Sequence, residues 1–77
     1  MKVYLFGILK ERLRELSVEV DVSIPSSASA IQQAFKSQYT SVAEIPFQVA
    51  INHFYATADS IIQVGDHVAL LPPVSGG

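Results

Sequence analysis

Apolar and polar positions alternate strictly in three stretches of the chain, which predicts three β-strands. Residues 2–7 alternate, with Val3 and Leu5 on the apolar side. Residues 17–24 alternate most cleanly, with valine or isoleucine at every even position and serine, glutamate or aspartate at every odd one. Residues 47–51 form the third stretch. Strands of this kind place one face on a hydrophobic core and the other in water.

Two other segments show the spacing of helices. Leu9, Leu13 and Leu16 recur at helical intervals among charged residues, which indicates a short amphipathic helix or turn. From Ala28 to about Tyr39 the apolar residues trace one helical stripe, and this segment is the predicted main helix. Pro25 ends the preceding strand, and either of the two serines that follow can cap the helix.

The C-terminal part of the chain reads as short strands separated by turns. Asn52-His53 suits a tight turn because asparagine tolerates left-handed backbone geometry. Residues 56–60 are small and polar, so we expect a turn or short helical piece before Ile61-Ile62, and a second turn at residues 64–66. Residues 67–71 are nearly all apolar, which predicts a central strand buried on both faces. The two prolines after it end the strand.

This order of elements predicts an α+β fold, in which a mixed sheet packs on one main helix. The arrangement is that of the β-grasp, or ubiquitin-like, fold. With 77 residues the chain is expected to form a single domain, residues 1–77, with a flexible C-terminal tail at residues 72–77. Fold alone does not define function.

Charge and composition exclude several classes of protein. The net charge is -2 and hydrophobic residues make up 49% of the chain, so we expect neither a nucleic-acid partner nor a disordered tail protein. Four of the five basic residues, Lys2, Lys10, Arg12 and Arg14, nevertheless fall near the N-terminus. This cluster is either a solvated helix face or a basic patch for an acidic partner or an anionic substrate.

Cysteine usage and the N-terminus bear on location. The chain has no cysteine, so it has no disulfide, thiolate zinc site or cysteine nucleophile. Residues 1–9 loosely resemble a signal peptide, but charged residues follow from Lys10 onward without a small-residue cleavage site. No segment approaches the roughly 20 apolar residues of a membrane span. We therefore predict a cytoplasmic protein without a membrane partner.

The histidines do not predict a metal site or an active site. His53 and His67 could meet Asp59 or Asp66, but no ligand-like spacing is present. No serine or cysteine nucleophile lies in a known motif either. We expect surface histidines, no bound metal or cofactor, and no catalytic residues belonging to this chain itself.

The aromatic residues are interpreted mostly as core. Phe54 and Tyr55 lie just past a predicted turn, so one of the two is expected to face outward. It could join Leu71 in a partner-binding patch, and Lys10 is a further candidate for that surface.

The C-terminal tail, residues 72–77, is the segment whose sequence predicts a chemical function. Pro72 and Pro73 favour an extended polyproline conformation of about 3.1 Å per residue, and Val74 and Ser75 continue this stem. The last residues, Gly76 and Gly77, lack a Cβ atom, so the backbone can pass through a narrow channel. Such a stem can reach roughly 18 Å into the pocket of another protein.

The terminal carboxylate of Gly77 needs activation before it can react. Its pKa near 3.5 makes it an anion and a poor electrophile at neutral pH. Acyl-adenylation by ATP would activate it, but the chain has no Walker-type phosphate loop, so a partner protein must use the ATP. The activated carbonyl can then accept sulfur to give a thiocarboxylate, which requires no cysteine in the carrier.

A family resemblance supports this chemistry. The stretches Val49-Ala50-Ile51-Asn52 and Val64-Gly65-Asp66-His67-Val68-Ala69-Leu70-Leu71-Pro72-Pro73-Val74-Ser75-Gly76-Gly77 resemble the small subunit of molybdopterin synthase, in the MoaD/ThiS family of sulfur carriers. The resemblance covers essentially the whole chain and is most specific in the last fourteen residues.

The resemblance implies a function and a set of partners. The terminal glycine, here Gly77, would be adenylated by an E1-like enzyme and thiocarboxylated. The tail would then enter the large subunit of the synthase, in a heterotetramer, and donate sulfur for the dithiolene of molybdopterin. In this family an acidic residue is common where His67 stands, and an arginine where Lys10 stands. A thiamin-pathway sulfur carrier, a ubiquitin-like protein modifier and a β-grasp interaction module with an inert tail remain alternatives.

Overall fold

The computed structural model describes residues 1–73; the predicted roles of Val74, Ser75, Gly76 and Gly77 lie outside the described residues. The elements in chain order are β1 (Lys2–Leu5), α1 (Gly7–Leu13), β2 (Ser17–Glu19), β3 (Ser26–Ser27), α2 (Ala28–Gln38), the 3-10 helix η1 (Thr40–Val42), β4 (Gln48–Ile51), β5 (Phe54–Tyr55), β6 (Ile61–Ile62) and β7 (Val68–Leu71). No helix within residues 1–73 has both the length and the apolar character needed to cross a membrane.

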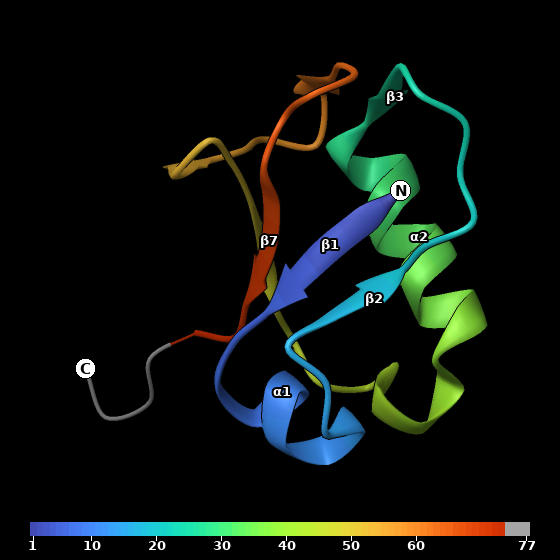
Figure 1. The fold of residues 1–77 in the computed structure, drawn as a ribbon, viewed down its shortest axis with the longest axis vertical. Coiled ribbons are helices and arrows are strands. Elements are labelled where there is room, and N and C mark those ends of the chain that lie inside the picture. Colours follow the sequence, from blue (N-terminus) through green and yellow to red (C-terminus); the bar gives the residue numbers. More distant parts are fainter. Residues whose placement is uncertain (74–77) are drawn as a thin grey trace.

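Five of the strands form one mixed sheet in the order β2-β1-β7-β4-β5. β1 and β7 run parallel, whereas the other neighbours in this sheet are antiparallel. α2 lies along one side of the sheet and α1 lies near the end of the sheet from which the C-terminal segment leaves (Figure 1). This arrangement confirms the predicted α+β, β-grasp fold with one main helix.

The strand β7 is central, as its continuous apolar sequence predicts. It pairs with β1 on one side and with β4 on the other. Val68 and Leu70 are 0% exposed and Ala69 is 6% exposed. A strand with neighbours on both edges and burial on both faces leaves no position for a polar side chain.

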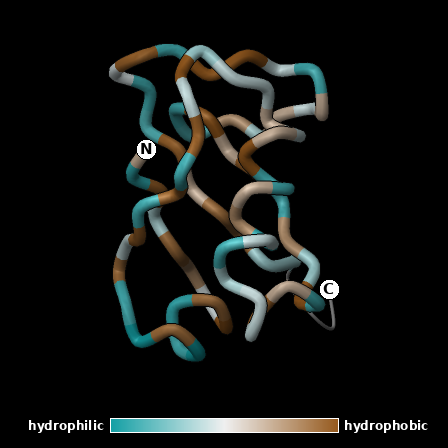
Figure 2. The backbone as a smooth tube through the Cα atoms, turned by 90° about the vertical axis from the view of Figure 1, so that its right-hand side faces the viewer, coloured by the Kyte–Doolittle hydropathy of each residue, from teal (hydrophilic) through white to brown (hydrophobic). Residues whose placement is uncertain are grey.

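The helix α2 supplies much of the core. Ser27 caps it, since its Oγ accepts a hydrogen bond from the Ala30 amide at 3.1 Å. Ile31 and Phe35 point at the sheet and are 0% exposed. The rings of Phe35 and Phe47 meet edge to face with centroids 5.3 Å apart, an arrangement that aromatic pairs favour. The alternation of hydrophobic and hydrophilic positions along the backbone can be followed in Figure 2.

The predicted strand over residues 17–24 is too long. β2 ends at Glu19, although Val20 still exchanges backbone hydrogen bonds with Met1. β2 lies at the edge of the sheet, and its register with β1 runs from Tyr4 opposite Ser17 to Lys2 opposite Glu19, where both strands end. The alternation of apolar and polar residues shows which side chains point toward the core. It can continue in an extended segment that is not paired with another strand.

Three apolar or aromatic side chains are more exposed than the sequence pattern indicates. Leu16 is 72% exposed because α1 stops at Leu13, where Arg14 takes left-handed geometry with φ 57°. Phe54 and Tyr55 are 78% and 70% exposed, so both face outward rather than one. β5 is only two residues long and lies at an edge of the sheet, so core atoms are not available on either side of it.

A second, smaller sheet was not predicted. Ser26 and Ser27 pair with Ile62 and Ile61 in a two-stranded antiparallel sheet, β3-β6. The same serines read as helix caps in the sequence, and Ser27 fills both roles. Because this pair joins segments that are far apart in the sequence, no local pattern predicts it.

Candidate functional site

The base of the tail lies at the end of the central strand. β7 pairs with β4 as far as Leu71, which lies opposite Gln48. Pro72 and Pro73 follow, and because proline has no N–H to donate, the ladder ends there. Pro72 is half-buried and Pro73 is exposed. In Figure 1 the chain bends away from the direction of β7 once the strand has ended.

Beside the base of the tail, the face of the sheet opposite α2 bears an apolar hollow. We call this side of the sheet the outer face. The hollow has a volume of about 250 Å³. Its lining residues come from β4, β5, β7, the β4–β5 turn, the residue before β7 and the link between β1 and α1: Phe6, Ala50, His53, Tyr55, His67, Ala69 and Leu71. Small residues on two adjacent strands, Ala50 opposite Ala69, leave this space open.

The candidate partner-surface residues divide between the two faces of the sheet. Leu71 is half-buried and lines the hollow on the outer face. Tyr55 lies opposite Ala50 and also lines the hollow, whereas Phe54 lies opposite Ile51 and so alternates to the other face. Lys10 is an exposed residue of α1. The structure therefore brings Tyr55, and not Phe54, next to Leu71.

Three rings stack across the outer face. Tyr4 and His67 lie nearly parallel, with centroids 4.4 Å apart and planes 10° from each other. His53 stacks on the same imidazole at 5.2 Å and 23°. The ammonium of Lys2 lies 5.7 Å from the centre of the Tyr4 ring. We call these four side chains the ring column; they come from β1, the start of β7 and the β4–β5 turn.

The β4–β5 turn holds His53 in place. Asn52 and His53 both have positive φ, 52° and 73°, which is the geometry of a two-residue hairpin turn and confirms the predicted tight turn. The Asn52 side chain accepts a hydrogen bond from the His67 amide at 2.8 Å. The Asn52 amide N–H donates to the His67 carbonyl at 2.7 Å. The two histidines are therefore positioned by direct hydrogen bonds between their two loops.

Asp66 fixes the second of these loops. One oxygen accepts a hydrogen bond from the Gln63 amide at 2.8 Å, and the other accepts one from Asn52 Nδ2 at 3.0 Å. The Gln63 backbone N–H, followed by the Asn52 side chain, holds the pKa of Asp66 below its usual value. Gly65 takes φ 93° in this turn, which confirms the turn predicted at residues 64–66.

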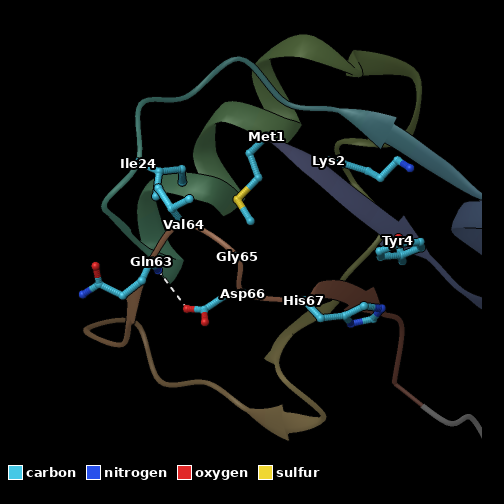
Figure 3. A pocket seen from close by; sticks show the side chains of 9 residues that line it. All are labelled: Met1, Lys2, Tyr4, Ile24, Gln63, Val64, Gly65, Asp66 and His67. Carbon is cyan, nitrogen blue, oxygen red and sulfur yellow. Dashed lines mark hydrogen bonds between the residues drawn. The ribbon is translucent and has the colours of Figure 1, made fainter.

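A second hollow of about 400 Å³ is also lined by His67 (Figure 3). Met1, Ile24 and Val64 line one side of this hollow, and Tyr4 and His67 lie together on another side (Figure 3). Figure 3 also shows the hydrogen bond from Gln63 to Asp66 in the loop that bounds this hollow. His67 thus lines both hollows.

Residues 1–73 contain no group of three or more histidine, aspartate or glutamate side chains that could hold a metal ion. The sequence predicted neither the hollow nor the ring column, because their members are far apart along the chain: Phe6 and Leu71 in the hollow, and Lys2 and His67 in the column, are each 65 positions apart. The only sequence signals were outward-facing Lys2 and Tyr4 in an alternating strand, and the turn at Asn52-His53.

Comparison with known proteins decides the family. Residues 3–77 of the sequence match the ThiS family. The chain belongs to the ThiS family. The match includes the sheet, both helices and the tail, so it extends over nearly the whole chain. ThiS-family proteins are small β-grasp sulfur carriers or ubiquitin-like modifiers, and in general they are not catalytic.

Solved structures agree with this fold. SAMP1 from Haloferax volcanii is 26% identical, with a TM-score of 0.80 over 100% of this ThiS-family chain and 98% of that one. Subunit 1 of a molybdopterin converting factor from Pyrococcus furiosus is 19% identical, with a TM-score of 0.80 over 95% of each chain. A chain in the complex of subunits 1 and 2 of the Helicobacter pylori molybdopterin-converting factor is 24% identical, with a TM-score of 0.63 over 99% of this chain and 96% of that one.

Proposed function

We propose that this protein is the sulfur carrier subunit of molybdopterin synthase. The observation that supports this most is the position of the tail base: Pro72 and Pro73 follow the central strand directly, and Leu71 before them lines an apolar hollow. The fold holds the start of the tail in a fixed place while the partner covers the hollow. The protein itself needs no catalytic residues for this role.

The tail is loaded by another protein. An E1-like enzyme binds ATP, and the Gly77 carboxylate attacks the α-phosphorus, so that pyrophosphate leaves and an acyl-adenylate forms. A sulfur nucleophile then attacks the glycyl carbonyl and AMP leaves. The product is a terminal thiocarboxylate, in which one oxygen of Gly77 has been replaced by sulfur. The ATP and the sulfur donor belong to this partner, and the carrier binds no cofactor.

The loaded tail is then inserted into the large subunit of the synthase. Pro72, Pro73, Val74 and Ser75 form the stem, and Gly76 passes through the narrow part of the channel. The thiocarboxylate of Gly77 donates sulfur to the pterin precursor of the dithiolene. Two carriers and two large subunits form the assembly, and the reaction takes place in the cytoplasm.

The outer face is the docking surface for this partner. Phe6 and Tyr55 are 44% and 70% exposed there, and Leu71 adjoins the base of the tail. Exposed aromatic side chains around a hollow are typical anchors of a protein interface. Lys10, an exposed residue of α1, adds a charge to this surface.

A ubiquitin-like modifier is the second candidate. The similarity to SAMP1 and to small archaeal modifier protein 1, both from H. volcanii, favours it. Both functions use an adenylated terminal glycine, but the modifier forms an amide with a lysine. A thiamin-pathway sulfur carrier is a third candidate, which shares the thiocarboxylate and differs in the acceptor.

Reconstituted synthesis distinguishes these functions. The carrier, its activating enzyme, ATP, a sulfur donor and the large subunit are incubated with the pterin precursor or with a thiazole precursor. We expect molybdopterin from the first and no product from the second. A variant with one residue added after Gly77 should give no product while keeping its circular dichroism. Product from the extended variant would contradict the proposal, and lysine-linked conjugates would favour the modifier.

A further inference from the structure

The chains that leave β1 and β7 stay in contact beyond the last residues that the sheet pairs. The two strands run parallel, and their last register pair is Leu5 with Leu70. Two residues further along each chain, the ring of Pro72 lies against Gly7, and its Cγ atom is 3.5 Å from the position that a Cβ atom of Gly7 would take. The base of the tail is therefore still held by the segment that joins β1 to α1.

Gly7 is a firm support for this ring. It lies between Leu5, the last residue of β1, and Leu9 of α1, whose side chains are 2% and 0% exposed. Gly7 takes φ 58°, which glycine adopts readily, and it has no side chain that would hold the ring away. Pro72 is accordingly half-buried, whereas Pro73 is exposed. Of the two prolines, the folded domain holds the first.

The contact with Gly7 limits the rotation that the covalent structure leaves most open. The ring of Pro72 locks its own φ, and Pro73 restricts the ψ of Pro72 to extended values. The ψ of Leu71 is restricted by the following proline to a range of roughly 40°. Rotation within this range moves the ring of Pro72 toward Gly7 or away from it. Contact between the two residues therefore selects the direction in which the chain continues.

Direction at Pro72 matters because the reactive group is far from it. Gly77 is five residues further on, which corresponds to about 15 Å in the extended conformation that prolines favour. A rotation of about 20° at the base would move the end of such a stem by about 5 Å. Misplacement of a reacting group by even about 1 Å can slow a reaction greatly. A stem that already points in the right direction also loses less conformational entropy on entering a partner.

We infer that the two prolines have separate roles: Pro72, held against Gly7, directs the tail into the active site of the E1-like enzyme, and Pro73 stiffens the stem. Gly7 and Pro72 are thus positioning residues for the adenylation of Gly77. This inference rests on the proposed function, because it concerns the same tail and the same reaction.

Alanine at each proline in turn tests this inference. Pro72→Ala frees the φ of residue 72 and the ψ of residue 71, and Pro73→Ala frees the φ of residue 73 and the ψ of residue 72. Each variant thus frees two backbone rotations. Pro72→Ala also removes the ring atoms that contact Gly7. The two variants therefore lose similar stiffness and differ in this contact.

Adenylation is measured with the E1-like enzyme as the exchange of labelled pyrophosphate into ATP, at increasing concentrations of the carrier. We expect Pro72→Ala to lower kcat about tenfold and Pro73→Ala about threefold, because fewer docked carriers have the tail in place. KM should be unchanged in both, since the folded domain that docks is the same. A loss of folded protein would instead raise the apparent KM and leave kcat unchanged, because it lowers only the concentration of competent carrier.

Gly65→Ala is the control for a loss of stability. Gly65 also has positive φ, 93°, so alanine is strained there, but no atom of the described residues lies within 4 Å of its Cβ position. This variant should keep the kcat of the unmodified protein. Urea denaturation of all three variants measures how much stability each has lost.

The outcomes separate the inference from the proposed function. Equal losses of kcat in Pro72→Ala and Pro73→Ala, or a loss that appears in KM alone, overturn the inference and leave the sulfur carrier function standing. Absence of exchange with the unmodified protein overturns both. The expected difference between the two variants, without a thiocarboxylate on Gly77 when a sulfur donor is added, supports the inference and contradicts the carrier function.

Discussion

The ring of Pro72 lies over Gly7. A Cβ atom at Gly7 would be 3.5 Å from Cγ and 3.6 Å from Cδ of this proline, which is ordinary van der Waals contact. Gly7 begins α1 and has φ 58°, a left-handed geometry that residues with side chains rarely adopt. The first residue of the tail is therefore held against the start of a helix whose geometry requires glycine.

Gly7→Ala should lower the free energy of unfolding by about 1 kcal/mol, because alanine is strained at this φ although its methyl group fits beside Pro72. Urea denaturation measures the change. Gly65→Ala is the matched comparison, since Gly65 has φ 93° with nothing within 4 Å. Both variants should lose stability, but only the Gly7 variant should shift the NMR signals of Pro72. An unchanged urea midpoint for Gly7→Ala would be evidence against strain at this position.

Phe35→Ala and Phe54→Ala compare the same substitution at a buried and an exposed site. Phe35 is 0% exposed and Phe54 is 78% exposed. Loss of the Phe35 ring leaves a cavity next to Phe47, so this variant should lose about 3–5 kcal/mol and be largely unfolded. Phe54→Ala should change stability by less than about 0.5 kcal/mol. Thermal denaturation gives both values, and equal losses would contradict the assignment of the core.

Local patterns predicted the elements that depend on local chemistry. Residues 67–71 are nearly all apolar, and this composition identified them as a central strand that is buried on both faces. Ser27 and the stripe that contains Ile31 and Phe35 identified the main helix and its cap. Asn52 and Gly65 identified turns because few residues adopt positive φ. These features together were sufficient for the α+β, β-grasp prediction.

The features that depend on contacts between distant segments were missed. The strand ending at Glu19 is limited by the extent of β1, and Ser26 pairs with Ile62 across thirty-six positions. The exposure of Phe54 and Tyr55 follows from their place at a sheet edge. The hollow and the ring column likewise require the strand order. The chemistry of Gly77 comes from the tail sequence and the family resemblance rather than from any contact within residues 1–73.

Acid should loosen the loop at residues 63–67. Hydrogen bonds from Gln63 and Asn52 lower the pKa of Asp66 in the folded protein, so their stabilisation is present at neutral pH. It is lost as the pH falls below about 4 and through the folded pKa. NMR shifts of the Gln63 and His67 amides, followed from about pH 6 to about pH 3, should report this transition.

Asp66→Asn is the control for that titration, because an amide does not change charge. The transition at the Gln63 amide should disappear in this variant, while signals of α2 should titrate as before. If the Gln63 amide still titrates in Asp66→Asn, another group is responsible.

Tyr55→Ala should weaken docking to the large subunit about tenfold, because Tyr55 lines the hollow beside Leu71. Phe54→Ala is the matched variant on the neighbouring residue, whose side chain alternates to the other face. It should bind within about twofold of the unmodified protein. Calorimetry at neutral pH measures both affinities. A larger effect of Phe54→Ala than of Tyr55→Ala would place the interface on the face covered by α2.

The claim on which the account depends is that the carboxyl end of the chain receives sulfur from a partner. The direct measurement is the intact mass of the protein after incubation with the E1-like enzyme, ATP and a sulfur donor, with fragmentation to locate the change. We predict a mass increase equal to the replacement of one oxygen by one sulfur, located at Gly77 and dependent on ATP. An unchanged mass in the presence of an active E1-like enzyme would contradict the account.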